Sequence, residues 1–151
     1  ADIIDVGGES TRPYATPVDS ESELRRIEPV LEALHGRLHI PISIDTSKAT
    51  VAQSAIDRGA EIVNDVTGLT SDSEMIDVVV RHQVGVCAMH MQGNPQTMQD
   101  NPVYQDVVSE VITYLKACDD RLIAAGVDPQ RICLDPGIGF GKTHEHNIEL
   151  V

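Results

Sequence analysis

Short apolar runs alternate with longer amphipathic stretches along the whole chain. The runs are rich in Ile, Val and Leu and occupy residues 3–6, 40–44, 61–64, 85–89 and 131–134. Nearly continuous apolar runs of this length are typical of strands that are covered on both faces. The pattern therefore predicts five buried strands.

The stretches between the runs have the spacing of helices. Apolar residues recur every three or four positions from Leu24 to Leu34, and Ser20 with Glu23 predicts a capping box where this helix starts. Pro29 falls inside the pattern, so we expect a kink or a local break there. Further helices are predicted over residues 48–58, 73–82 and 103–125, with a fifth that starts near residue 146.

This strict alternation predicts a parallel sheet of the α/β class, either open and doubly wound or closed into a barrel. In both architectures, ligands bind beyond the carboxyl ends of the strands. The residues after the first strand, Gly7-Gly8-Glu9, lack the glycine-rich dinucleotide fingerprint, which favours the barrel. We expect a partial (β/α)8 TIM barrel of about five consecutive β/α units, with residues 1–151 forming one domain.

Polar or ionisable residues stand at all five strand exits. Asp45, Asn64 and Asp135 each end a strand, so in a barrel two carboxylates and one amide face a shared pocket. A carboxylate accepts two N–H donors side by side and an amide both donates and accepts, which suits a flat heterocycle such as a pterin or a purine. The alternative is that Asp45 caps the next helix and that Asp135 opens the turn through Pro136.

Other polar residues leave two interpretations open. His90, at a strand end, is either catalytic or a histidine satisfied in the core. Lys142 could neutralise an anion, although a solvated loop lysine is the commoner outcome. His144 and His146, one residue apart and without a third ligand, make a poor metal site, so a role at a helix start is expected.

The composition excludes several classes of function. The net charge is -13, with 24 acidic and 11 basic residues and no basic run, and only 3% of residues are aromatic, which argues against a nucleic-acid partner. No apolar stretch is long enough to span a membrane. The three cysteines predict free thiols and a cytoplasmic location. The chain opens without Met, inside a predicted strand, so we expect a fragment of a longer protein.

Five segments together resemble the dihydropteroate synthase family, whose members have a (β/α)8 barrel. They are DVGGESTRP at 5–13, SIDTSK at 43–48, IVNDVTG at 62–68, CAMHMQGNPQTMQ at 87–99 and LDPGIGFGKTHEHN at 134–147. The resemblance covers the whole chain in the family's order. It implies condensation of 6-hydroxymethyl-7,8-dihydropterin diphosphate with 4-aminobenzoate to 7,8-dihydropteroate and diphosphate.

The resemblance also implies residue roles. The pterin's donor-rich edge is assigned to the catalytic set Asp45, Asn64 and Asp135, and its ring to Met89, Phe140 and Val66. The 4-aminobenzoate site, where sulfonamides compete, is assigned to a mobile loop that contains Thr11, Arg12 and Pro13. No metal ligand is expected within this chain, because the Mg²⁺ ligand of the family belongs to a first strand that the chain lacks.

Two positions depart from the family pattern, namely Tyr14, where Gly is frequent, and Ile138, where some members have an aromatic residue. We expect the isolated chain to be inactive and the full-length protein to be a possible homodimer. Two rivals remain, a pterin-binding methyltransferase domain of the corrinoid type and a non-catalytic barrel module.

Overall fold

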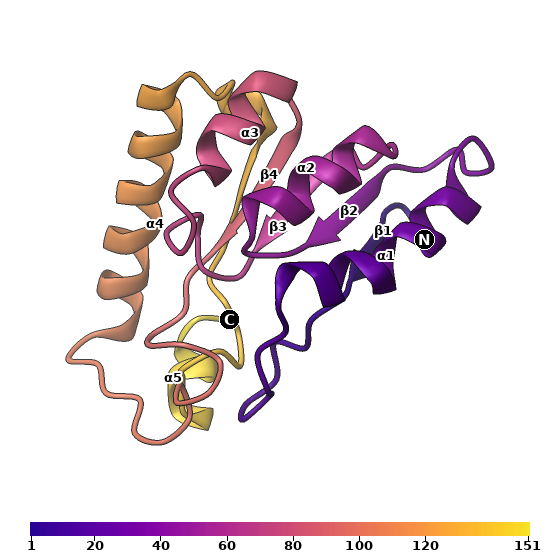
Figure 1. Cartoon of the computed structure of the whole chain (residues 1–151). Coiled ribbons are helices and arrows are strands. Elements are labelled where there is room, and N and C mark those ends of the chain that lie inside the picture. The colour runs from indigo at the N-terminus through magenta and orange to yellow at the C-terminus, as the bar shows by residue number, and fades with distance from the viewer.

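The computed structural model describes residues 1–151 and contains a single sheet of five parallel strands. The strands lie in sequence order as β1 (Ile4–Gly7), β2 (Ile42–Asp45), β3 (Ile62–Asp65), β4 (Gly85–Met89) and β5 (Ile132–Asp135). The helices are α1 (Ser20–Leu34), α2 (Ala49–Asp57), α3 (Met75–His82), α4 (Val107–Ala125) and α5 (His144–Glu149), with a 3-10 turn, η1 (Pro129–Arg131), before β5. Five consecutive β/α units are therefore present, as predicted (Figure 1).

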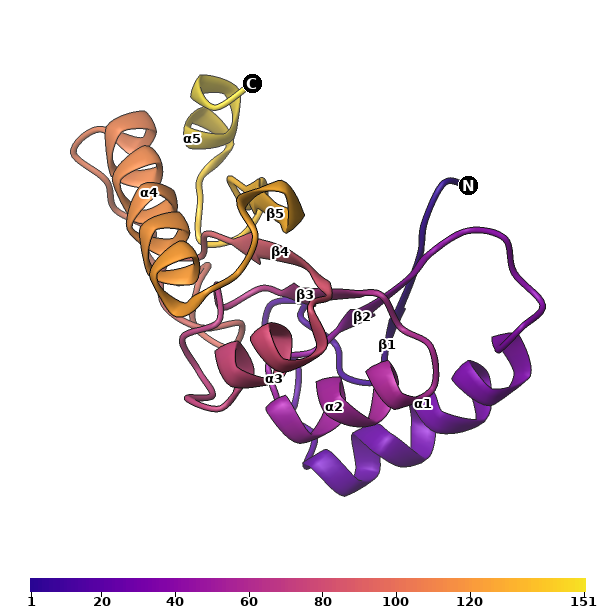
Figure 2. The same ribbon diagram turned by 90° about the horizontal axis from the view of Figure 1, so that it is seen from above.

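The sheet curves, and its helices α1 to α4 lie on the outer side of the arc (Figure 2). Ile44, Val63 and Val86 form one row across β2, β3 and β4, and all three are buried against these helices. The inner, concave face carries the alternate residues, and no helix covers it. Ser43 and Met89, which point to this face, are nevertheless buried.

The first turn of α1 differs from the predicted capping box. Asp19 caps the helix, because its carboxylate accepts a hydrogen bond of 2.8 Å from the Ser22 amide. Glu23 is fully buried and turns to Lys48 on the neighbouring unit instead of returning to the helix start. The helix continues through Pro29 without a break. None of the helices is both long and apolar enough to traverse a lipid bilayer.

The loops that leave the carboxyl ends of the strands meet at one end of the sheet (Figure 1). Tyr14, in the loop after β1, donates through its hydroxyl to Asp100 in the loop after β4, over 3.1 Å. Tyr104, in that same loop, donates to the Gly141 carbonyl after β5, over 2.8 Å. The loop after β4 therefore connects the first and the last of the five units.

Candidate functional site

Asp45, Asn64 and Asp135 lie on the concave face, at the carboxyl ends of their strands. Asp45 and Asn64 are direct register partners on β2 and β3. On the next strand, β4, the register partner of Asn64 is Cys87. Two residues further along β4, on the same face, Met89 pairs with Asp135 on β5. Asn64 and Asp135 are thus two strands apart across the sheet and two residues apart along it, roughly 12 Å between their Cα atoms, so that their side chains can approach one fused ring system from two sides. The structure brings the three predicted residues together at one rim.

The Asp45 carboxylate has no hydrogen-bond partner in the fold. The first amide of α2, that of Ala49, donates to the Asp72 carboxylate over 2.8 Å, and the residue before the helix is Lys48, so the alternative role of Asp45 as a helix cap is wrong. Burial, followed by the nearby charges of Asp5 and Asp65, raises the pKa of Asp45 to about 7. An acceptor that is partly buried and unused by the protein is available for an N–H donor on a ligand.

Asn64 is held by a residue that sequence reasoning did not single out. Its amide donates to Asp5 on β1 over 3.2 Å. Asp5 and Asn64 lie on the same face of the sheet, with β2 between their strands. This contact uses one N–H of the amide and leaves the other N–H and the carbonyl oxygen of Asn64 for a ligand. The sequence does contain a sign of this role, because Asp5 interrupts an apolar run at a position whose side chain must point to the opposite face from Ile4 and Val6.

Asp135 opens the turn after β5, as its alternative role predicts. One carboxylate oxygen accepts from the Gly137 amide over 2.7 Å. Gly137 has a φ of +68°, and a β-carbon there would lie 2.0 Å from the His90 carbonyl oxygen. The turn therefore requires glycine. It also fixes one Asp135 oxygen and leaves the other without a protein partner.

Lys142 is buried, contrary to the expectation of a solvated loop lysine. Only 3% of it is exposed. Its ammonium donates to the carbonyls of Gly137 at 2.9 Å and Phe140 at 3.0 Å, and lies 3.0 Å from His90 Nδ1. Burial lowers the pKa of Lys142 to about 8, and burial with the Lys142 charge lowers the pKa of His90 to about 4. A neutral His90 accepts from the ammonium, and Lys142 holds the loop that carries Phe140.

We expect Lys142→Met to lower the free energy of unfolding by about 2 kcal/mol, because buried acceptors lose their donor. Lys116→Met is the matched control, since Lys116 is exposed and pairs only with Asp120, and it should change stability by less than about 0.5 kcal/mol. Urea denaturation of the two variants measures the difference. Equal effects would contradict the structural role of Lys142.

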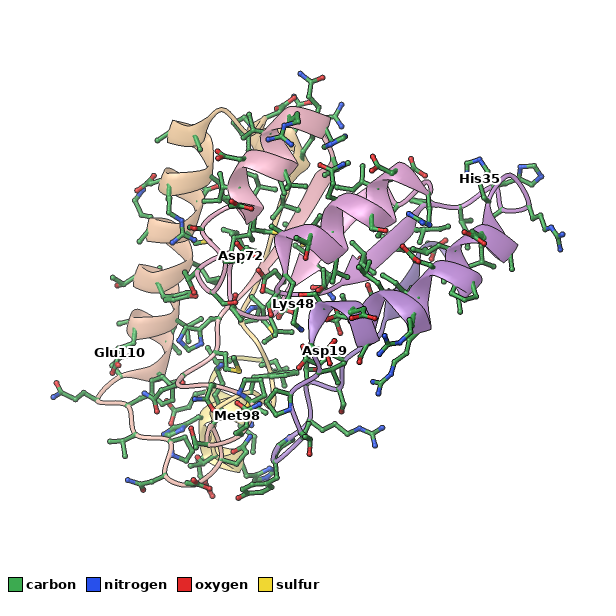
Figure 3. All side chains as sticks on the ribbon, in the orientation of Figure 1. Asp19, His35, Lys48, Asp72, Met98 and Glu110 are labelled. Carbon is green, nitrogen blue, oxygen red and sulfur yellow. The ribbon has the colours of Figure 1, made fainter.

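Lys48 joins the loop after β1 to α1. It contacts the carboxylates of Glu9 and Glu23, the latter over 2.6 Å. The other oxygen of Glu9 accepts from the Val18 amide over 2.8 Å, which closes the loop at its base. Figure 3 shows Lys48 at the amino end of α2, close to the start of α1 at Asp19. Sequence reasoning missed this network because its members lie in three separate segments.

A cavity of about 290 Å³ lies beside Asp45. It is bounded by the exits of β1, β2 and β3, and its walls include the predicted residues Thr11 and Val66. The loop after β4 closes one side through Asn94 and Gln96. Arg12 and Pro13 lie elsewhere, on a separate hollow of about 570 Å³ between their own loop and α1. The predicted aminobenzoate residues are therefore divided between two hollows.

Met89 and Phe140 flank the rim near Asp135. Met89 is buried and pairs with Asp135 across β4 and β5. Phe140 closes the turn after β5, where its amide donates to the Gly137 carbonyl over 3.0 Å. Val66, directly after β3, is also buried. Apolar groups thus lie on both sides of the polar rim.

The side chains of this chain do not form a site for a cation on their own. No group of three or more His, Cys, Asp or Glu side chains is placed to hold a metal ion. His146 instead completes a capping box with Thr143 at the start of α5, in line with the expected role at a helix start. Mg²⁺ therefore enters no step derived from these residues.

Comparison with known proteins agrees with this geometry. A family model described as "Pterin binding enzyme" matches residues 1–151. The chain belongs to the family of pterin-binding enzymes. The dihydropteroate synthase of Synechocystis is 47% identical over 151 residues, which are all of this chain and 52% of that protein. The chain therefore spans about half the length of this curated relative.

Solved structures of this family share the fold. The dihydropteroate synthase of Yersinia pestis, in complex with a sulfonamide drug, superposes with a TM-score of 0.95 at 41% identity, over 99% of this chain and 54% of that one. That of Burkholderia cenocepacia, complexed with 7,8-dihydropteroate, gives 0.85 at 49% identity, over 95% and 51%. The prediction of a partial barrel of the dihydropteroate synthase type is confirmed.

Proposed function

We propose that the protein containing this chain is a dihydropteroate synthase, and that residues 1–151 supply its pterin-binding part. It condenses 6-hydroxymethyl-7,8-dihydropterin diphosphate with 4-aminobenzoate and releases diphosphate. The observation that supports this most is the unpartnered Asp45 carboxylate beside Asn64 and the free oxygen of Asp135. Adjacent acceptors at one rim suit the N–H edge of a pterin.

The same residues have a role in the chemistry. Departure of diphosphate leaves positive charge on the methylene carbon of the pterin, and the amine of 4-aminobenzoate then attacks that carbon. Negative charge on Asp45 and Asp135 stabilises the developing positive charge. Asn64 orients the ring through its carbonyl oxygen. Met89, Val66 and Phe140 pack against the ring and exclude water, while Thr11, Arg12 and Pro13 contribute to the aminobenzoate site.

The two lysines near the strand exits are not free to bind the diphosphate. Lys48 is neutralised by two carboxylates and Lys142 is buried among carbonyls. Since the relatives are about twice as long, we assign the diphosphate and Mg²⁺ sites to residues outside this sequence. The cytoplasmic location and the homodimer stay predictions.

A turnover assay on the intact protein and on the 151-residue chain tests the proposed synthase activity and the assignment of the diphosphate and Mg²⁺ sites to residues outside this sequence. We expect the intact protein to form dihydropteroate and the chain alone to show no turnover. An intact protein without condensation activity would leave the methyltransferase as the better assignment. Calorimetric titration with a pterin separates that outcome from a non-catalytic module, which should give no saturable heat.

A further inference from the structure

Two cysteines face each other on neighbouring strands of the concave face. Cys87 on β4 and Cys133 on β5 are direct register partners, in the same row as Asn64 and Asp45. Adjacent strands lie about 4.8 Å apart, within the separation of about 4.4–6.8 Å that the Cα atoms of two bridged cysteines require. The two thiols are therefore close enough for one small group to join them.

Both thiols are free and lie on the concave face. Cys133 is exposed and Cys87 is half-buried. The third cysteine, Cys118, is buried on α4, where its thiol contacts the Gly68 carbonyl at 3.4 Å. Burial, followed by the charges of Cys133 and Asp135, raises the pKa of the Cys87 thiol to about 12. Cys87 is thus protonated at neutral pH and is a poor nucleophile.

These properties limit what the pair can bind. Zinc takes four ligands, and the chain places no third His, Cys, Asp or Glu beside the two thiols. A disulfide forms only when an oxidant removes two electrons from the two thiols, and the structure holds no oxidant. A bridging atom that needs only two sulfur ligands, and whose leaving groups take up the two thiol protons, requires neither further ligands nor an oxidant.

We propose that Cys87 and Cys133 form a dithiol site for trivalent arsenic. Arsenous acid reacts with the two thiols to give two S–As bonds, and two As–O bonds break. The two thiol protons leave with the two hydroxyl groups as two molecules of water. Arsenic stays in the trivalent state, so no oxidant or reductant is consumed. The bridge lies two residues before Asp135 on β5, at the floor of the candidate site.

The test is titration of the intact, reduced protein with sodium arsenite, followed by calorimetry and by native mass spectrometry. We expect one arsenic at this site and an affinity about 100-fold weaker in Cys87→Ser and in Cys133→Ser, since each variant loses the second linked contact. Cys118→Ser is the matched control and should bind as the wild type does. These readouts measure arsenic directly, so they are independent of dihydropteroate synthase activity.

Unchanged affinity in both Cys87→Ser and Cys133→Ser would overturn the proposal, as would an equal loss in Cys118→Ser. Cys133 is the more exposed of the two thiols, so Cys133→Ser should disturb the fold less than Cys87→Ser does. It therefore gives the decisive comparison even where Cys87→Ser folds poorly.

Discussion

Gly137→Ala is expected to destabilise the intact protein by about 3 kcal/mol or more. The new β-carbon would overlap the His90 carbonyl oxygen at 2.0 Å and lie 3.1 Å from the Met89 side chain, and the residue has a φ of +68°. Neither the backbone carbonyl nor the packed methionine can withdraw without opening the end of β4. Chemical denaturation measures the loss.

Gly139→Ala separates the overlap from the backbone strain. Gly139 also has a positive φ, +86°, but a β-carbon there meets nothing within 4 Å. Strain alone should cost about 1 kcal/mol. Pterin affinity should fall only in Gly137→Ala, because the Gly137 amide fixes Asp135. Similar losses in the two variants would show that the contact with His90 does not govern this turn.

The grouping of polar residues at the strand ends could be predicted from the sequence, because all strands of a parallel sheet have their carboxyl ends at the same edge of the sheet. That rule is enough to group Asp45, Asn64 and Asp135 without coordinates. The polar residues inside the apolar runs were discounted, although they mark the concave face of the sheet. β2 reads Ile42, Ser43, Ile44, Asp45, so its apolar residues already alternate with polar ones.

The interactions that could not be predicted depend on partners with no sequence signature. Lys142 is buried because backbone carbonyls surround it, and a carbonyl belongs to every residue. Glu23 abandons the capping box because Lys48, 25 positions away, offers an ion pair at 2.6 Å. Local patterns compete with distant charges, and only the fold determines which contact forms.

Asp45→Asn is expected to weaken pterin binding about 100-fold while it stabilises the ligand-free protein. The asparagine presents an NH₂ donor to a ligand edge that itself donates, so a favourable contact is lost and a repulsive one is added. Calorimetry with the pterin measures the first effect. Asp57→Asn, at an exposed position on α2, removes the same charge and should leave the affinity unchanged.

The stability gain of Asp45→Asn should depend on pH in a defined direction. The folded-state pKa of Asp45 is raised to about 7 from an ordinary 3.8, so folding retains a proton that the unfolded chain releases. The resulting stability is fully present below about pH 4 and is lost as the pH rises through about 7. Above pH 7 the wild type contains a buried, unpartnered charge, and Asp45→Asn should be more stable by on the order of 2 kcal/mol. Denaturation at pH 4 and pH 8 measures this difference. A variant that is less stable at pH 8 would mean that Asp45 supports the fold and is not held ready for a ligand.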